Sequence, residues 1–305
     1  MERQLRDIEY FSVVAEHGNL GRAAEALGLS QPALSKSLRR LEIAMQAKLV
    51  RRTSKGVELT AAGRTLFEQV HRLRLSLDDV TRSVTELGQG RTGHLRIGAG
   101  PAVAMDLVPR TCAALLKIAP SVTFQITVHD NDTSTSAVRH GELDFAIATI
   151  WTSHYNDLAV EQVSEEDYSL YVAANHPLAR KKHVALVDLT PYRWAITGNN
   201  MVTHTRVNQA FMDAKLPAPS ITIHTNFLPL NHHLVASSNL ISYTSRYMIN
   251  QVMPRFRFVE LPVKELTWVR QTGVYYRKDA YLSPAARRFI DLLKSTAKAM
   301  ASGKQ

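Results

Sequence analysis

The chain has 305 residues, enough for two or three domains that each bury a core, and it carries a formal net charge of +10. This charge favours an anionic partner, either nucleic acid or a membrane surface. The sequence has no run of about 18 apolar residues and no apolar signal core near Met1, and a single cysteine, Cys112, excludes an internal disulfide bond. We therefore expect a cytoplasmic protein that is neither exported nor bound to a membrane.

The first thirty residues contain two segments with helical periodicity. Apolar residues at helical spacing predict a helix from Leu5 to Ala15, which Gly18 is placed to end. A second helix carries the apolar repeat of residues 20–27 and breaks at Gly28. Both helices should pack against the segment that follows.

The third helical segment has two opposed faces. Ser30 supplies a capping hydroxyl and Pro32 lies in the first turn, so the helix begins here after a tight turn. One face is apolar and belongs to a core, with Leu34, Leu38, Leu41 and Met45 at helical spacing. The other face is short, polar and cationic, as a helix needs to be to enter a DNA major groove. The pattern predicts a helix-turn-helix.

A basic hairpin is expected after this helix. Residues 48–52 and 57–59 are predicted to be strands around a turn that ends at Gly56, where glycine can adopt a positive φ. Between Leu34 and Gly56, seven Lys and Arg residues face only Glu42. The hairpin is therefore predicted to be a wing beside the helix-turn-helix. A solvated charged face is the simpler alternative, but the helix cap, the opposed faces and the hairpin occur together.

These residues resemble the amino-terminal signature of the LysR-type transcriptional regulators. The resemblance rests on SQPALSKSLRRLE (residues 30–42) and KLVRRTSKGVELTAAG (residues 48–63). It implies a winged helix-turn-helix domain over residues 1–60, with promoter DNA and RNA polymerase as partners, and a minor-groove contact by Arg52. The expected DNA-binding residues are Arg22, Ser30, Gln31, Pro32, Ser35, Lys36, Arg39, Arg40, Arg51, Arg52 and Lys55.

A heptad repeat follows Thr60, which can cap a new helix. Apolar residues alternate at spacings of three and four, the a/d pattern of a helix that pairs with a partner. We predict a linker helix over residues 61–90 that forms a homodimer, although burial against its own chain is the alternative. The resemblance implies a homotetramer as the complete assembly. The expected dimerisation residues are Leu66, Val70, Leu73, Leu77, Val80, Val84 and Leu87.

Residues 91–305 alternate strand-like and helix-like segments. The order strand, helix, strand, helix, strand over residues 94–149 implies a parallel sheet with right-handed crossovers. A second set begins near Tyr168, and the last strand and a helix capped by Ser283 return to the first half. The expected strands are 94–99, 122–128, 145–149, 168–173, 194–197, 221–224, 240–243 and 269–276, and the expected helices are 105–118, 134–140, 203–214, 228–236 and one from 284.

Two α/β lobes with a cleft between them are therefore predicted, the first over about 91–164 and 268–305 and the second over about 165–267. The segments GELDFAIAT (residues 141–149) and ANHPLA (residues 174–179) are similar to the effector-binding domain of the same family, which has the type 2 periplasmic-binding-protein fold. The resulting fold class is multidomain α and α/β.

An effector is expected at the carboxyl ends of the strands, where helix amino termini present unpaired N–H groups. Residues 91–305 contain 23 Lys and Arg against 16 Asp and Glu, which favours an anionic effector such as a carboxylate. Phe227 and Met201 are expected to line an apolar part of the pocket, so an aromatic or another small organic acid is predicted. The expected effector-binding residues are Gly100, Pro101, Ala102, Val103, Asp130, Thr149, Thr197, Asn199, Met201, Val202, Thr203 and Phe227.

The sequence gives no catalytic, cofactor or metal motif. The spacing of His204, His224, His232 and His233 matches no common metal site, and the glycines of residues 98–100 lack the third glycine of a dinucleotide fingerprint. We expect a non-enzymatic transcription regulator that binds promoter DNA and responds to a small, anionic organic metabolite. The alternative is a ligand-independent DNA-binding repressor or architectural protein.

Overall fold

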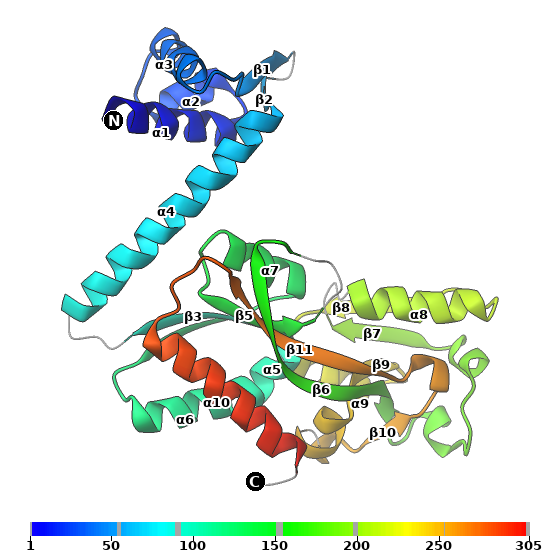
Figure 1. Ribbon diagram of the computed structural model, residues 1–305. Coiled ribbons are helices and arrows are strands. Elements are labelled where there is room, and N and C mark those ends of the chain that lie inside the picture. The colour runs from blue at the N-terminus through cyan, green and yellow to red at the C-terminus, as the bar shows by residue number, and fades with distance from the viewer. Residues whose placement is uncertain are drawn as a thin grey trace. The chain divides into compact units, whose positions relative to one another are not determined.

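A computed structural model describes residues 2–53, 56–88, 93–150, 155–197, 201–252 and 254–302. The chain divides into two compact units, residues 1–82 and 83–305, and each is described by itself (Figure 1). The amino-terminal unit is called the head below, and the carboxy-terminal unit is called the α/β unit.

The head contains the three helices and the hairpin predicted from the sequence, followed by most of a long helix. These elements are α1 (Glu2–His17), α2 (Leu20–Ala26), α3 (Gln31–Ala44), β1 (Val50–Thr53), β2 (Gly56–Leu59) and α4 (Ala61–Gly88). The two strands are antiparallel. The winged helix-turn-helix and the long helix are thereby confirmed.

Local side-chain chemistry sets the ends of these helices. The Asn19 side chain accepts hydrogen bonds from the backbone N–H groups of Gly21 and Arg22 at the start of α2, and Ser30 Oγ accepts from Ala33 N at 3.4 Å at the start of α3. Gly28, in the turn between α2 and α3, has a φ of 65°, a conformation that a side chain disfavours. These short-range interactions determine the tight turn between α2 and α3.

The α/β unit contains the strands and helices predicted from the sequence in the predicted order, with several added segments. Its strands are β3 (His94–Ala99), β4 (Thr123–Val128), β5 (Phe145–Thr149), β6 (Leu158–Ala173), β7 (Arg193–Thr197), β8 (Ser220–Thr225), β9 (Ser242–Ser245), β10 (Phe258–Leu261) and β11 (Trp268–Arg277). Its α-helices are α5 (Pro101–Met105), α6 (Leu107–Ile118), α7 (Asn131–Arg139), α8 (Met201–Asp213), α9 (Leu228–Ala236) and α10 (Pro284–Ala301).

The main sheet has the strand order β10-β6-β11-β5-β3-β4, and β9 also pairs with β6. Strands β4 and β5 are both parallel to β3, as predicted. Strands β6 and β11 are antiparallel to each other and run from one lobe into the other (Figure 1). A smaller parallel sheet of β7 and β8 belongs to the second lobe.

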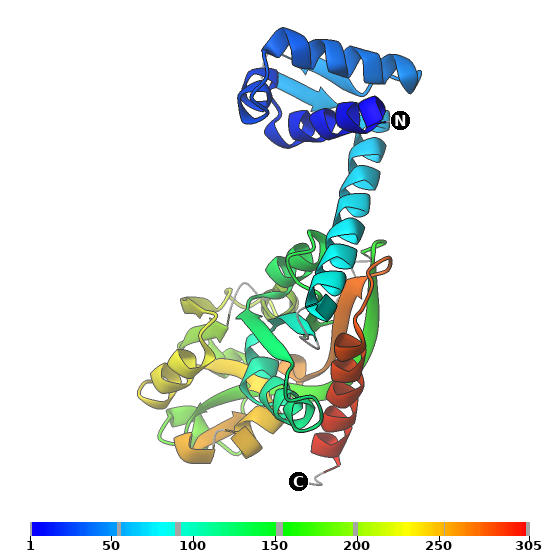
Figure 2. The same cartoon turned by 90° about the vertical axis from the view of Figure 1, so that its left-hand side faces the viewer.

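Alternation along β5 explains how helices cover both faces of the first lobe's sheet. Phe145 and Ile147 contribute to a core with α6 and α10, whereas Ala146 and Ala148 contribute to a second cluster that includes Val138 of α7. Successive side chains of a strand point to opposite faces, so α7 lies across the sheet from α6 and α10 (Figure 2). A separate core, which includes Trp194, forms the second lobe.

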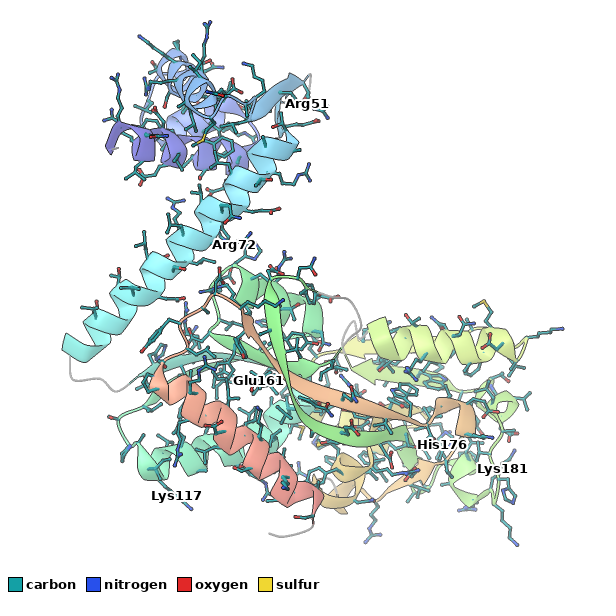
Figure 3. All side chains as sticks on the ribbon, viewed as in Figure 1. Arg51, Arg72, Lys117, Glu161, His176 and Lys181 are labelled. Carbon is teal, nitrogen blue, oxygen red and sulfur yellow. The ribbon has the colours of Figure 1, made fainter. Side chains whose placement is uncertain are left out.

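Two features of the α/β unit differ from the prediction. The helix expected over 105–118 is divided at Asp106, whose φ of −140° and ψ of −57° are not helical. The strand expected from Tyr168 begins ten residues earlier in β6, in a stretch rich in acidic residues that does not resemble a buried strand. These acidic residues have partners elsewhere in the fold. Glu161, for example, accepts hydrogen bonds from Tyr276 and Lys294 (Figure 3).

Candidate DNA-binding surface and effector cleft

Helix α3 exposes the polar face expected to read DNA and buries the opposite one. Leu34, Leu38 and Leu41 are at most 7% exposed in the head core, whereas Met45, expected on the same face, is 36% exposed at the end of the helix. Several predicted DNA-binding residues on or beside α3 are exposed: Arg22, Ser30, Gln31, Pro32, Lys36 and Arg39. Ser35 is half-buried. The polar face is therefore available to a large ligand such as DNA.

Arg40, also predicted to bind DNA, is held by a carboxylate inside the head. Its Nε donates to Asp7 Oδ2 at 2.6 Å, its Nη2 donates to Asp7 Oδ1, and Ser37 Oγ donates to the same carboxylate. Burial raises the pKa of Asp7, but the hydrogen bonds from Arg40 and Ser37 outweigh it and lower the pKa below its usual value. The structure thus gives Arg40 a role that the sequence did not predict, in joining α3 to α1.

The wing approaches the head closely at its base. Val57 N donates to Gly18 O at 2.8 Å, and a methyl group at Gly56 would overlap that same carbonyl oxygen. On the exposed surface of the wing, Arg51 pairs with Glu58 across the hairpin at 2.7 Å (Figure 3). An exposed pair of this kind contributes little stability. The side chain of Arg52 and the whole of Lys55 lie outside the described residues.

A second carboxylate fixes the connection between α3 and the wing. Glu42 is 9% exposed, and it accepts from Lys48 Nζ at 2.7 Å and from Leu49 N at 3.0 Å. Burial raises the pKa of Glu42, but the hydrogen bonds from Lys48 and from the backbone of Leu49 and Val50 lower it overall. Glu42, the one acidic residue between Leu34 and Gly56, therefore orients β1 relative to α3.

The heptad residues of α4 form an apolar stripe exposed to solvent. Leu66 packs against the head core and Val70 is half-buried, whereas Leu73, Leu77, Val80 and Val84 are 58%, 58%, 56% and 63% exposed. The side chain of Leu87 lies outside the described residues. We call Leu73, Leu77, Val80 and Val84 the α4 seam, and none of these residues belongs to the head core.

In the α/β unit, several predicted effector-binding residues meet at the carboxyl ends of β3 and β5. Gly100 N donates to Ile147 O at 2.9 Å. Asn131 donates from Nδ2 to Thr149 O at 2.9 Å and accepts from Thr149 N at 3.2 Å. Asp130 caps α7 by accepting from Thr133 N. The start of α7 and the end of β5 are thus joined at the edge of the sheet.

The remaining predicted effector-binding residues have varied surroundings. Pro101, Ala102 and Val103 are half-buried in α5, and Thr203 is buried in α8. Phe227 is 65% exposed, so it does not line an enclosed apolar pocket. Asn199 lies outside the described residues. For Thr197, Met201 and Val202, the structure describes the position of the residue in β7 or α8, and the side chains lie outside the described part.

Arg270 is a polar residue beside the carboxyl end of β5 that the sequence analysis missed. Its Nε donates to Thr149 Oγ1 at 2.6 Å, and its guanidinium carbon lies 4.6 Å from the centre of the Tyr168 ring. Arg270 therefore connects β5 of the first lobe to the start of the second lobe. Arg270 is half-buried between the exposed Val269 and Gln271 of β11, a position that no local sequence pattern marks.

The two lobes also contact each other on the side of α5. Tyr247 Oη donates to Asp106 Oδ2 at 2.6 Å, and this hydrogen bond contributes, after burial, to raising the pKa of Tyr247 to about 12. Beside it, Ala102 and Met105 pack against a small apolar cluster that includes Met248. Polar and apolar contacts together hold the lobes in the arrangement seen.

The histidines singled out from the sequence do not form a metal site within the described residues, where no group of three or more potential ligands occurs. His204 and His224 stack with their ring centres 5.4 Å apart. His232 is fully buried beside Tyr171 and Phe258, and burial lowers its pKa to about 4. The described helices also include none that is long and apolar enough to cross a membrane.

A capped helix with an exposed cationic face, a wing and a two-lobed α/β unit define a transcription regulator with separate DNA-binding and ligand-binding parts. Residues 5–64 match the family described as bacterial regulatory helix-turn-helix protein, lysR family, and residues 88–298 match the LysR substrate binding domain. The chain belongs to the LysR family of transcription regulators, whose members are not enzymes.

Individual relatives match over almost the whole chain. The SDS degradation transcriptional activation protein of Pseudomonas sp. (strain ATCC 19151) is 31% identical over 95% of this chain and 95% of its own length. Among solved structures, full-length CbnR complexed with its target DNA covers 96% of this chain and 99% of its own, with a TM-score of 0.51 and 21% identity. The effector binding domain of QuiR in complex with shikimate covers 68% and 97%, with a TM-score of 0.57 and 19% identity. These structures share the fold.

Proposed function

We propose that this protein binds promoter DNA through α3 and the wing, and changes transcription when a small anionic organic metabolite occupies the cleft between the lobes of the α/β unit. One observation supports the DNA-binding part above all. The exposed face of α3 carries Lys36 and Arg39 directly opposite the leucines that anchor the helix in the head core. Cations fixed on a rigid helix can neutralise phosphates while neighbouring polar residues reach base edges.

Gln31, Pro32 and Ser35 are the proposed base-edge contacts, because short side chains early in a recognition helix lie deepest in the groove. Arg22, Ser30, Lys36, Arg39 and Arg51 are proposed to contact phosphates, as are Arg52 and Lys55 from the resemblance to the family. The CbnR structure, which is a complex with target DNA, supports the proposal that the protein binds DNA. The operator itself can be identified by sequencing the genomic fragments that bind to the purified protein.

Arg39→Gln should weaken operator binding several-fold and reduce the slope of log affinity against log salt by about one unit. Its thermal unfolding should match that of the wild type, because Arg39 is exposed. Arg40→Gln is the matched control. It should lower the melting temperature, since Arg40 donates to the buried Asp7. Salt titrations and thermal unfolding of both variants separate the two roles, and an unchanged slope for Arg39→Gln would remove Arg39 from the interface.

An effector is proposed to bind where Gly100, Asp130 and Thr149 approach one another at the ends of β3 and β5. Support comes from the fold, because open α/β sheets bind ligands at the carboxyl ends of their strands. It also comes from the QuiR effector binding domain, whose structure is a complex with shikimate, a carboxylate. The surplus of cations in the α/β unit agrees with an anionic ligand.

A thermal-shift screen of organic acids should identify compounds that raise the melting temperature of the full-length protein. A ligand that binds only the folded state at a hundred times its Kd stabilises by about 2.7 kcal/mol, which is several degrees for a protein of this size. Operator binding measured with and without each hit then shows whether the ligand regulates. If no acid shifts the melting temperature while DNA binding is intact, the protein fits the alternative of a ligand-independent repressor or architectural protein.

We further propose that the regulator is a cytoplasmic homodimer or homotetramer paired through α4, and that it acts with RNA polymerase at the promoter. The exposed α4 seam supports pairing, because a stripe of large apolar side chains on a long helix is stable in water only when it is covered. Two heads held by one pair of helices would suit an operator with two half-sites.

A further inference from the structure

A pocket of about 170 Å³ lies on the second lobe, between β10 and the chain that follows β6. One wall comes from residues 259–262, in β10 and the turn after it, and the other comes from within residues 178–184, which include part of the short 3₁₀ helix η1 (Pro177–Arg180). Lys181, one of the lining residues, is labelled in Figure 3. Strand β10 lies at the edge of the main sheet, where β6 and β11 separate it from β5. We call this cavity the β10 pocket, and it shares no residue with the proposed effector site.

A buried histidine holds the wall that contains η1. His176 is fully buried, its Nδ1 accepts from Leu178 N at 3.1 Å, and its Nε2 donates to Asn239 O at 3.3 Å. Burial lowers the pKa of His176, so the ring stays neutral and one nitrogen can accept while the other donates. The opposite wall is fixed as well, because β10 pairs with β6 along its whole length. Both walls of the pocket are therefore in place before a ligand arrives.

A carboxylate closes the loop that carries the cations of the β10 pocket. Asp188 accepts from Lys181 Nζ at 2.7 Å and from Ala185 N at 3.0 Å, and these hydrogen bonds lower the pKa of Asp188 below its usual value. One side chain thus ties both ends of the loop. Between the two ties, Lys182 and His183 line the pocket and are exposed. Neither has a hydrogen bond or an ion pair among the described residues, so both can bind a partner from outside.

The acidic residue on the β10 wall is already paired. Glu260 Oε1 accepts from Arg246 Nε at 2.7 Å, and Arg246 Nη1 also donates to Asp167 at 2.8 Å. Glu260 is opposed by two lysines among the lining residues, Lys181 and Lys182. The pocket therefore offers positive charge and N–H donors to an anion.

The base of the β10 pocket is apolar. Leu178 and Leu261 are 2% and 1% exposed and belong to the core of the second lobe, against which Val184 also packs. All three residues line the pocket. A cavity of about 150 Å³ with apolar walls can hold a benzene ring, so the pocket has room for one small ring. A ligand that combines an apolar group with an anionic group fits both parts of the lining.

We propose that the β10 pocket is a second ligand site, and that it binds a phosphate monoester with a small apolar group. The apolar group lies against Leu178, Val184 and Leu261, and the phosphate oxygens accept hydrogen bonds from Lys182 Nζ and a ring N–H of His183. A phosphate offers three acceptor oxygens to donors on separate flexible side chains, whereas a carboxylate is matched best by the parallel N–H groups of one arginine. This proposal goes beyond the proposed function, because the site lies outside both the head and the proposed effector site.

The test measures the binding of phenyl phosphate to the full-length protein by calorimetry at constant ionic strength, with phenol, benzoate and inorganic phosphate as reference probes. Phenyl phosphate should bind saturably and about tenfold more tightly than each reference, because none of these combines the ring with the phosphate. Lys182→Gln should weaken its binding about tenfold and His183→Ala several-fold. Both variants should unfold at the wild-type temperature, since the two residues are exposed. Ala179→Phe, which places a ring inside the pocket, should abolish binding.

Arg180→Gln is the matched control, because Arg180 is an exposed cation beside Lys181 that does not line the pocket. It should leave the affinity for phenyl phosphate nearly unchanged. If Arg180→Gln loses as much affinity as Lys182→Gln, the general positive charge of this surface attracts the phosphate and the site is overturned.

Three further results would overturn the site: no saturable binding of phenyl phosphate, binding of any reference probe with equal affinity, or binding that persists unchanged in Lys182→Gln and His183→Ala. Phosphate that binds to the cations of the head does not affect the comparison, because none of the substitutions changes the head. Operator binding by Lys182→Gln without phenyl phosphate should equal that of the wild type. Failure of the β10 pocket therefore leaves the proposed function standing, whereas a wild type that binds no specific DNA contradicts the proposed function alone.

Discussion

Replacing Leu77 with aspartate should weaken dimerisation by roughly a thousandfold. Leu77 is 58% exposed at the centre of the α4 seam, and a symmetric dimer buries it twice. Burial of one leucine contributes about 2 kcal/mol, so the loss from two copies is about 4 kcal/mol, and every 1.4 kcal/mol is tenfold. Two aspartates facing each other in an apolar seam add repulsion to this loss. Sedimentation equilibrium of the full-length protein measures the dissociation constant directly.

Operator binding should fall with dimerisation, because a single head contacts only one half-site. At protein concentrations below the new dissociation constant, the affinity of Leu77→Asp for a two-site operator should approach that for a single half-site. Glu68→Gln, an exposed position on the other side of α4, is the control and should remain dimeric. A Leu77→Asp variant that dimerises as tightly as the wild type would show that the α4 seam is not the pairing surface.

Gly63→Ala should destabilise the head by about 3 kcal/mol, the range expected when a substitution overpacks a closed core. Gly63 lies in the first turn of α4, and a methyl group there would come within 2.8 Å of the carbonyl carbon of Leu49 and closer still to its oxygen. The clash is with backbone rather than with a flexible side chain. Leu49 is 2% exposed in the head core, so it cannot move without disturbing that core.

The carbonyl groups of Lys48 and Leu49 also accept hydrogen bonds that hold the start of the wing. We therefore expect Gly63→Ala to weaken DNA binding as well. Thr60 N donates to Leu49 O at 3.0 Å, and Thr60 Oγ1 donates to Lys48 O at 2.5 Å. Urea unfolding followed by circular dichroism gives the loss of stability. Gly88→Ala is the control, because a methyl group there meets no atom within 4 Å and should cause no loss. A Gly63→Ala variant as stable as the wild type would mean that the start of α4 moves away from β1 at little cost.

The head was predictable from the sequence because short-range interactions determine its elements. Asn19 and Ser30 cap the helices that immediately follow them, and the leucines of α3 repeat within one helix. The partner of Arg40 was not predictable in this way, because Asp7 lies 33 residues earlier. A basic residue on a polar face has the same local pattern whether it contacts phosphate or a carboxylate of its own chain.

In the α/β unit, too, contacts between residues far apart in the sequence could not be predicted. Buried strands such as β3 and β5 were predicted with their correct bounds, because their runs of apolar residues are distinctive. The first half of β6 was missed, since the partners that accommodate its acidic residues, such as Lys294 for Glu161, come from the end of the chain. Arg270 was likewise missed, because its partners Thr149 and Tyr168 come from strands far from it in the sequence.

Strands β6 and β11 also determine how the lobes can move. They pair along ten residues of β11, and their register shifts between Thr272 and Gly273, two residues from Arg270. A paired ribbon resists stretching but twists readily, and a bulge increases the local twist. Any change in the angle between the lobes must therefore be taken up as torsion of this ribbon, concentrated beside Arg270.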